Sequence, residues 1–218
     1  MASTSQGQCR ICETAVAKTQ MTRHLKKCLG KTDSGNDQLL VLIQDRYVPS
    51  YWVYVLMDES TILSQVDWML RDLWLECCGH MSAFSSKSAA YLDEPEPSLW
   101  GREERSMDDV TLAEALLGEK ELRYQYDFGS TTELTVRIVG DKLPGTGDEM
   151  RIVARNDAPD IACHACGKSA TELVFENWNT IPYCEDCIPP TDEETMMLPV
   201  INSPRMGVCA YTGPTREP

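Results

Sequence analysis

Two cysteine pairs of identical spacing limit the fold of residues 160–190 more than any other feature of the chain. Each pair has the form C-x2-C, seventeen residues separate the pairs, and the four cysteines are Cys163, Cys166, Cys184 and Cys187. A C-x2-C turn presents two thiolates from one knuckle, and zinc takes four such ligands in a tetrahedron. The spacing therefore predicts a four-cysteine zinc ribbon over 160–190, in which the closed ligand shell makes the ion structural. His164, inside the first pair, is expected to be a bystander.

A second set of cysteine and histidine residues lies near the N-terminus. Its spacing is C-x2-C-x11-H-x3-C, and its members are Cys9, Cys12, His24 and Cys28. Residues four apart on a helix share one face, so the last two ligands suit a helix. Val16, Met21 and Leu25 stand where a ββα finger places its small apolar core. We expect a C2HC zinc finger over residues 1–32 and, with the ribbon, two structural zinc ions in the chain.

Positive charge is concentrated in the same N-terminal segment. The first 32 residues carry six lysines and arginines against one glutamate, although the whole chain has a net charge of −14. An acidic remainder repels phosphate, so any nucleic-acid contact belongs to this segment. The side chains suited to contact are Arg10, Lys18, Gln20, Arg23, Lys26 and Lys27. A lone finger covers only about three base pairs, and single fingers also bind proteins, so both a protein partner and nucleic acid remain open.

Composition favours a soluble cytoplasmic protein with no membrane contact. Residues 1–8, MASTSQGQ, lack the charged and apolar regions of a secretory signal, and no run approaches the roughly 18 apolar residues of a membrane span. Hydrophobic residues make up 42% of the chain, which is enough for a globular core. In a reducing compartment, ten cysteines indicate metal ligation more than disulfides.

The central residues 38–155 predict an α+β domain with a small mixed or antiparallel sheet and two helices. The expected elements are two strands in 39–57 interrupted at Pro49, a helix over 61–76, a strand over 80–86, a charged loop over 92–109, a helix over 112–117 and a hairpin around Gly129. Residues 191–218, which follow the ribbon, predict an extended tail, and Cys209 within it is expected to be a free thiol.

Several stretches of the central domain resemble the plasmid pRiA4b ORF-3-like family. They are PSYW, CGHMSAF and VTLAEALLGEKELRYQYDFG, in that order, and the resemblance covers roughly residues 38–140. It implies an α+β fold and an association with mobile elements, and it carries no established activity. The chain departs from the family at polar positions: Val53 follows Trp52 where arginine is common, and Ser82 stands where a second histidine is frequent.

These features predict a non-catalytic adaptor or regulatory protein that recognises a protein partner or nucleic acid through its basic finger. The alternative is an enzyme with a site near His80 and Asp127, accompanied by Glu133 and Trp52, although nothing gives these residues catalytic spacing. Asp127 also begins a DFG tripeptide, which we interpret as a hairpin turn because no glycine-rich phosphate loop accompanies it. Cys77 and Cys78, next to His80, are expected to be packing residues.

Overall fold

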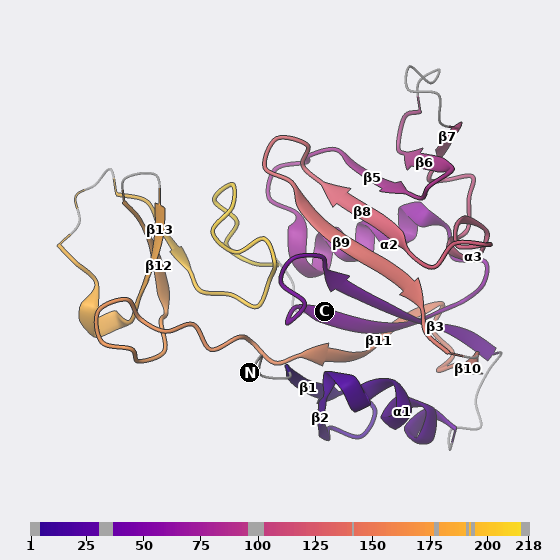
Figure 1. Ribbon diagram of the computed structural model, residues 1–218, viewed down its shortest axis with the longest axis horizontal. Helices are drawn as coiled ribbons and strands as arrows, with labels where there is room; N and C mark the ends of the chain where they lie inside the picture. The colour runs from indigo at the N-terminus through magenta and orange to yellow at the C-terminus, as the bar shows by residue number, and fades with distance from the viewer. Residues whose placement is uncertain are drawn as a thin grey trace. The chain divides into compact units, whose positions relative to one another are not determined.

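The computed structural model of the chain describes residues 5–30, 37–95, 103–140, 142–176, 179–190, 192 and 195–214. The chain divides into two compact units (Figure 1). The first unit comprises Met1–Leu70 and His80–Asp157, and the second comprises Arg71–Gly79 and Ala158–Pro218. A short internal segment is thus grouped with the C-terminal part of the chain.

A mixed α/β fold is confirmed, but the sheet of the first unit is much larger than expected. It has eleven strands, in the order β2-β1-β11-β4-β3-β9-β8-β5-β6-β7, with β10 paired to β3. The strands are β1 (Gln6–Cys9), β2 (Ala15–Ala17), β3 (Asp37–Asp45), β4 (Trp52–Met57), β5 (Ser82–Ser85), β6 (Ala89–Leu92), β7 (Glu103–Ser106), β8 (Leu122–Tyr126), β9 (Thr132–Ile138), β10 (Leu143–Pro144) and β11 (Met150–Asn156). Neighbours pair antiparallel except β6 and β7, which are parallel. The sheet is therefore mostly antiparallel.

Two of the expected connections are confirmed. The chain turns at Pro49 between β3 and β4, and β8 and β9 form a hairpin. Asp127 opens this hairpin turn with φ 63°, and its Oδ1 accepts hydrogen bonds from the backbone N–H groups of Gly129 (2.9 Å) and Ser130 (3.2 Å). A short polar side chain tolerates this left-handed conformation better than most. The DFG tripeptide is thus a turn.

The helices lie close to their predicted positions. The predicted 61–76 helix is α2 (Leu63–Leu70), which continues as one π-helical turn, η1 (Arg71–Leu75). The 112–117 helix is α3 (Leu112–Ala115), which begins with a capping box formed by Thr111 and Glu114. On α2, the buried Asp67 accepts hydrogen bonds from Ser82 Oγ (2.6 Å) on β5 and Tyr124 Oη (2.7 Å) on β8. These bonds tie α2 to the sheet.

The expected charged loop contains an additional strand. β7 lies inside the segment predicted as a loop and pairs with β6. Residues 93–95 and 107–109 are turns or irregular chain as predicted, and residues 96–102 lie outside the described part of the chain. A four-residue strand with alternating exposure carries too little periodicity to be recognised in a charged sequence.

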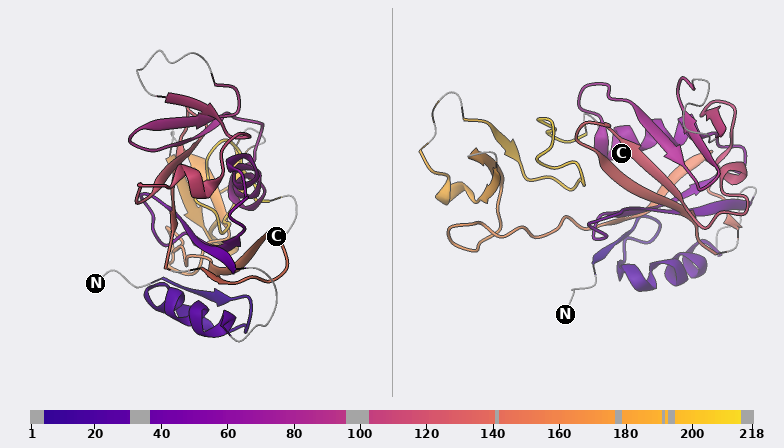
Figure 2. Two further views of the ribbon diagram at one scale, coloured as in Figure 1. Left: turned by 90° about the vertical axis from the view of Figure 1, so that its right-hand side faces the viewer. Right: turned by 45° about the horizontal axis from the view of Figure 1, so that its top comes forward.

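The N-terminal segment is built into the large sheet. β1 pairs with both β2 and β11, and α1 (Lys18–Leu29) follows β2 (Figure 2). Met21, Leu25 and Leu29 of α1 are fully buried in one cluster with alternate residues of β3 and β4. Alternate residues of a strand share one face, so α1 covers one face of the sheet. Val16, Met21 and Leu25 pack in an apolar core as predicted, but this core is shared with the large sheet and is not the small core of a separate finger.

The second unit contains a three-stranded sheet in the order β13-β12-β14. Its strands are β12 (Glu172–Glu176), β13 (Asn179–Tyr183) and β14 (Met197–Pro199), and a 3₁₀ turn, η2 (Glu185–Cys187), follows β13. The sequence predicted an extended tail, whereas β14 pairs with β12 and Ser203, Arg205 and Tyr211 are buried. Within this unit, Ser203 Oγ donates a 2.7 Å hydrogen bond to the carbonyl of Trp74, which ties the tail to the Arg71–Gly79 segment.

No helix in the described ranges is both long enough and apolar enough to cross a membrane.

Candidate metal centres

Three groups of cysteine and histidine side chains in the described part of the chain could hold a metal ion. Two of them are the sets expected from the sequence. The N-terminal set consists of Cys9, Cys12, His24 and Cys28. The C-terminal set, also called the ribbon set below, consists of Cys163, Cys166, Cys184 and Cys187. Within each set, all ligand atoms lie within 4.8 Å of one another. Ligands of a tetrahedral zinc with Zn–S bonds of 2.3 Å are about 3.8 Å apart, so both sets have the spacing of a four-coordinate site.

The N-terminal set is assembled by one turn and one helix. β1 ends at Cys9, whose N–H donates to the carbonyl of Thr14 (3.0 Å) across the turn that carries Cys12. His24 and Cys28 lie one turn apart on α1. The Sγ of Cys12 is 3.2 Å from Nε2 of His24, while Cys9 is buried beneath them. The apolar face of α1 thus fixes the helix that supplies two ligands.

The thiols of this set differ strongly in acidity. Hydrogen bonds with the side chain and backbone of Thr14 lower the pKa of Cys12 to about 6. Burial, together with the neighbouring thiol of Cys12, raises the pKa of Cys28 to about 12. One thiol therefore ionises readily and its charge opposes ionisation of the next. A bound dication removes this opposition, since it binds the thiolate form of each cysteine in the set.

The C-terminal set is held by two knuckles at the end of the small sheet. In the first, Gly167 has φ 74° and its N–H donates to the carbonyl of Cys163 (3.0 Å); a side chain would be strained in this conformation. In the second, the N–H of Cys187 donates to the carbonyl of Cys184 (2.9 Å) within η2. The sulfur atoms of Cys166 and Cys184 are 3.6 Å apart, which brings the two knuckles together.

Few apolar side chains pack around the cysteines of the C-terminal set. Cys163 and Cys184 pack with Val174 and Tyr183 in a cluster that Ile181 and Ile188 partly cover. His164 is exposed, makes an edge contact with Tyr183 at 6.2 Å, and is not part of the ligand group. The sequence between the two cysteine pairs predicts a connecting hairpin with Trp178 in its apolar cover, and Trp178 lies outside the described residues.

The ribbon thiols show the same division of acidity. Burial acts to raise the pKa of Cys163, but hydrogen bonds with the backbone of Cys184, Cys166 and Ala165 outweigh it and lower the pKa to about 6. Hydrogen bonds with Cys166 and Cys184 raise the pKa of Cys187 to about 12. The backbone thus stabilises one thiolate, and an ion is needed to hold all four deprotonated.

The expected contact residues fall into two groups on the N-terminal segment. Arg10, Gln20, Arg23 and Lys27 are exposed. The last three lie at positions i, i+3 and i+7 of α1, which places them on one face of the helix. We call this surface the basic face of α1. It lies on the side of the helix away from Met21, Leu25 and Leu29.

Lys18 and Lys26 are less accessible than this face. Lys18 Nζ donates a 2.6 Å hydrogen bond to the carbonyl of Pro49, and burial with the nearby charge of Arg137 lowers its pKa to about 8. The end of the Lys26 side chain lies so close to Gly140 that an added Cβ there would be 2.8 Å from Lys26 Cε. Both lysines are half-buried.

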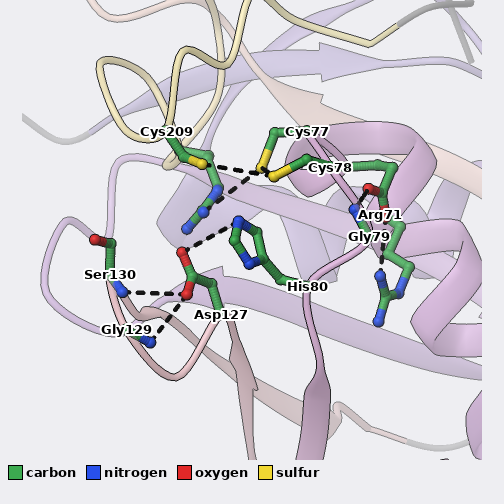
Figure 3. Close-up of polar contacts among 11 residues, drawn as sticks. Arg71, Cys77, Cys78, Gly79, His80, Asp127, Gly129, Ser130 and Cys209 are labelled. Carbon is green, nitrogen blue, oxygen red and sulfur yellow. Dashed lines mark hydrogen bonds and ion pairs between the residues drawn. The ribbon is translucent and has the colours of Figure 1, made fainter.

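The residues of the alternative enzyme site are only partly together. His80 Nε2 lies 3.6 Å from Asp127 Oδ2 (Figure 3). The His80 ring also makes an edge contact with Tyr126. Glu133 is engaged by Arg123, whose Nε donates to it at 2.8 Å. Trp52 is fully buried and donates from Nε1 to Ser5 Oγ at 2.8 Å. Of the four residues, the His80–Asp127 pair is the one in mutual contact.

The third candidate group contains the cysteines that the first two do not use, namely Cys77, Cys78 and Cys209. The sequence predicted packing residues and a free thiol at these positions, yet Cys209 Sγ lies 3.7 Å from Cys78 Sγ. Cys209 is far from Cys78 along the chain, so no spacing rule could have paired them. The one available signal was that three cysteines remained unassigned.

Comparison with known proteins assigns no family to the chain. No protein-family model matches the chain, and no curated protein matches it. Among solved structures, the chain is similar to MM3350, a protein of unknown function from Methanosarcina mazei Go1. The TM-score is 0.47 and the identity 16%, over 56% of this chain and 70% of that chain.

Proposed function

We propose that the chain is a cytoplasmic zinc-binding adaptor, without catalytic activity, that recognises an acidic protein partner through the basic face of α1. The observation that carries the proposal is the fixed presentation of that face. α1 is anchored at its C-terminal half by two ligands of the N-terminal set and along its inner side by three fully buried side chains. A rigid helix loses little conformational entropy when it binds.

Zinc is the metal that best suits both four-residue sets. Cysteine thiolate and histidine nitrogen are its usual ligands, and four protein ligands leave no position for substrate or water. In this proposal one zinc closes a C2HC finger and the other closes a four-cysteine ribbon. Both ions are structural, so the function resides on the protein surface.

A protein partner is favoured over nucleic acid by the size of the basic face. From Gln20 to Lys27 the helix rises about 10 Å, which matches about three base pairs and is too short for a specific DNA site. A small cluster led by one arginine is sufficient for a protein hot spot.

The test compares ligands and charge-reversal variants by fluorescence anisotropy across a salt series. The ligands are a labelled polyglutamate peptide, duplex DNA, single-stranded DNA and single-stranded RNA. The variants of the zinc-loaded full chain are Arg23→Glu on the basic face and Lys87→Glu, a matched change at an exposed lysine between β5 and β6.

The proposal predicts that the peptide binds, that Arg23→Glu weakens it at least tenfold and that Lys87→Glu leaves it nearly unchanged. If a nucleic acid binds more tightly than the peptide, and Arg23→Glu reduces the slope of log K against log salt concentration by about one, the basic face recognises nucleic acid and the proposal is wrong. Equal weakening by both variants would mean that net charge, and not the basic face, controls binding.

The His80–Asp127 contact favours one second candidate, an enzyme in which Asp127 orients His80 as an acid–base group. In that case turnover of a hydrolase substrate panel would disappear in His80→Ala.

We also propose that residues 38–140 form a member of the plasmid pRiA4b ORF-3-like family, with the association to mobile elements that the family implies. Support comes from the three sequence stretches given above and from the α/β fold of the region that contains them. In Figure 1 the last stretch runs through α3 and β8 to the hairpin turn.

A further inference from the structure

All ten cysteines of the chain fall into three spatial groups. Seven belong to the two four-residue sets described above, and the remaining three are Cys77, Cys78 and Cys209. These three belong to one compact unit, although the first two follow η1 and the third lies in the tail. Figure 3 shows their sulfur atoms turned toward one another.

The distances among these thiols fit a shared ion better than a disulfide. Cys78 Sγ is 3.7 Å from Cys77 Sγ and 3.7 Å from Cys209 Sγ. A disulfide requires about 2.05 Å between sulfurs, whereas the edge of a tetrahedron of zinc-bound sulfurs is about 3.8 Å. The ribbon set, whose sequence spacing independently indicates zinc, has a corresponding distance of 3.6 Å between Cys166 and Cys184.

The tail holds Cys209 in an unusual backbone conformation. Cys209 and Ala210 both have φ 53°, a left-handed conformation that costs a non-glycine residue about 1 kcal/mol or more. Two such residues in succession need compensation from the surrounding structure. Ser203 contributes by bonding to the carbonyl of Trp74, and a metal ion bound to Cys209 would contribute much more.

The charge beside the thiols also suits a metal–thiolate group. Arg205 is fully buried, and its Nη2 lies 3.6 Å from Cys77 Sγ. Arginine is almost never fully buried unless it is paired, and a thiolate is one group that can pair with it. Three thiolates around one divalent zinc carry a net charge of −1, which is what a neighbouring guanidinium balances; three neutral thiols carry none.

We propose that Cys77, Cys78 and Cys209 bind a third zinc ion, which fastens the tail to the segment that follows η1. Zinc takes a fourth ligand beyond the three thiolates. Residues 77–80 read Cys-Cys-Gly-His, so the sequence itself offers a histidine next to these cysteines. This site has no part in binding by the basic face of α1, so its failure would leave the proposed function intact.

The test counts zinc in the full chain, purified under reducing conditions with zinc supplied, by elemental analysis and native mass spectrometry. The proposal predicts three zinc ions per chain, two in Cys209→Ser and three in Ala210→Ser. Ala210→Ser is the matched control because it introduces the same hydroxyl at the next residue, in the same backbone conformation. Two ions in the wild type, or three in Cys209→Ser, would overturn the proposal.

A cobalt titration keeps the result interpretable if Cys209→Ser folds poorly. Charge-transfer absorption of cobalt rises with the number of thiolates bound, and the wild type would use all ten cysteines. Cys78→Ser should reduce the absorption by about three tenths, because the whole third site is lost while the other two remain. An absorption equal to that of the wild type would contradict a metal site at these residues.

Discussion

Replacement of Cys184 by serine tests whether zinc is the main stabiliser of the ribbon. The buried apolar side chains of β12 and β13 are Leu173, Val174 and Tyr183. At about 1.5–3 kcal/mol each, they contribute roughly 4–9 kcal/mol. Ordering the two five-residue strands β12 and β13 costs about 10–20 kcal/mol. Without zinc the balance is therefore unfavourable by several kcal/mol, and structural zinc supplies about 10–16 kcal/mol.

We expect Cys184→Ser to unfold residues 163–187 while the eleven-stranded sheet remains folded. Amide hydrogen exchange followed by mass spectrometry measures both regions in one sample. Loss of only about 4 kcal/mol already lowers protection in β12 and β13 about a thousandfold, since each tenfold step corresponds to 1.4 kcal/mol. Protection in β3, β4 and β9 should match the wild type.

His164→Ala is the matched control, because His164 lies between two ligands in sequence but outside the ligand group. It should leave exchange in β12 and β13 unchanged. Unaltered protection in Cys184→Ser would refute the reasoning, as would equal losses in both variants.

Three further changes test the first unit. Gly7→Ala should cost about 1–3 kcal/mol in urea unfolding, because its Cβ would meet the carbonyl of Arg155 where β1 pairs with β11; full stability would contradict the close pairing. Thr111→Ala should cost about 1 kcal/mol in the same assay by removing a capping box, and Thr111→Ser should restore most of it. The hydrogen bond from Arg123 holds the pKa of Glu133 below its ordinary value of 4.5, so this pair stabilises the fold above about pH 4.5 and the gain disappears as the pH falls through the lowered pKa. Glu133→Gln should therefore flatten the acid side of the stability profile, and an unchanged profile would count against the ion pair.

Local patterns predicted the elements that depend on residues near one another in sequence. The paired spacings around Cys163 and Cys184, the interruption at Pro49 and the hairpin at Asp127 all follow from short-range chemistry. So does the packing of Met21 and Leu25, since a helix places residues four apart on one face.

Features that depend on long-range pairing could not be predicted in the same way. β1 is only four residues long and pairs with β11, which lies more than a hundred residues later. The sequence of a short strand does not specify which distant strand it pairs with. For this reason the N-terminal finger was expected to be a separate module, and the central sheet was expected to be small. Cys209 illustrates the same limit, because its neighbours are determined by the fold of the tail.

The central claim is that two clusters of cysteine and histidine side chains bind structural zinc ions. Its most direct test is anomalous diffraction at the zinc absorption edge from crystals of the full chain. The account predicts one peak among the ligand atoms of the N-terminal set and one among those of the ribbon set, each about 2.3 Å from the sulfurs. Empty density at either set, or zinc bound only at surface carboxylates, would contradict it.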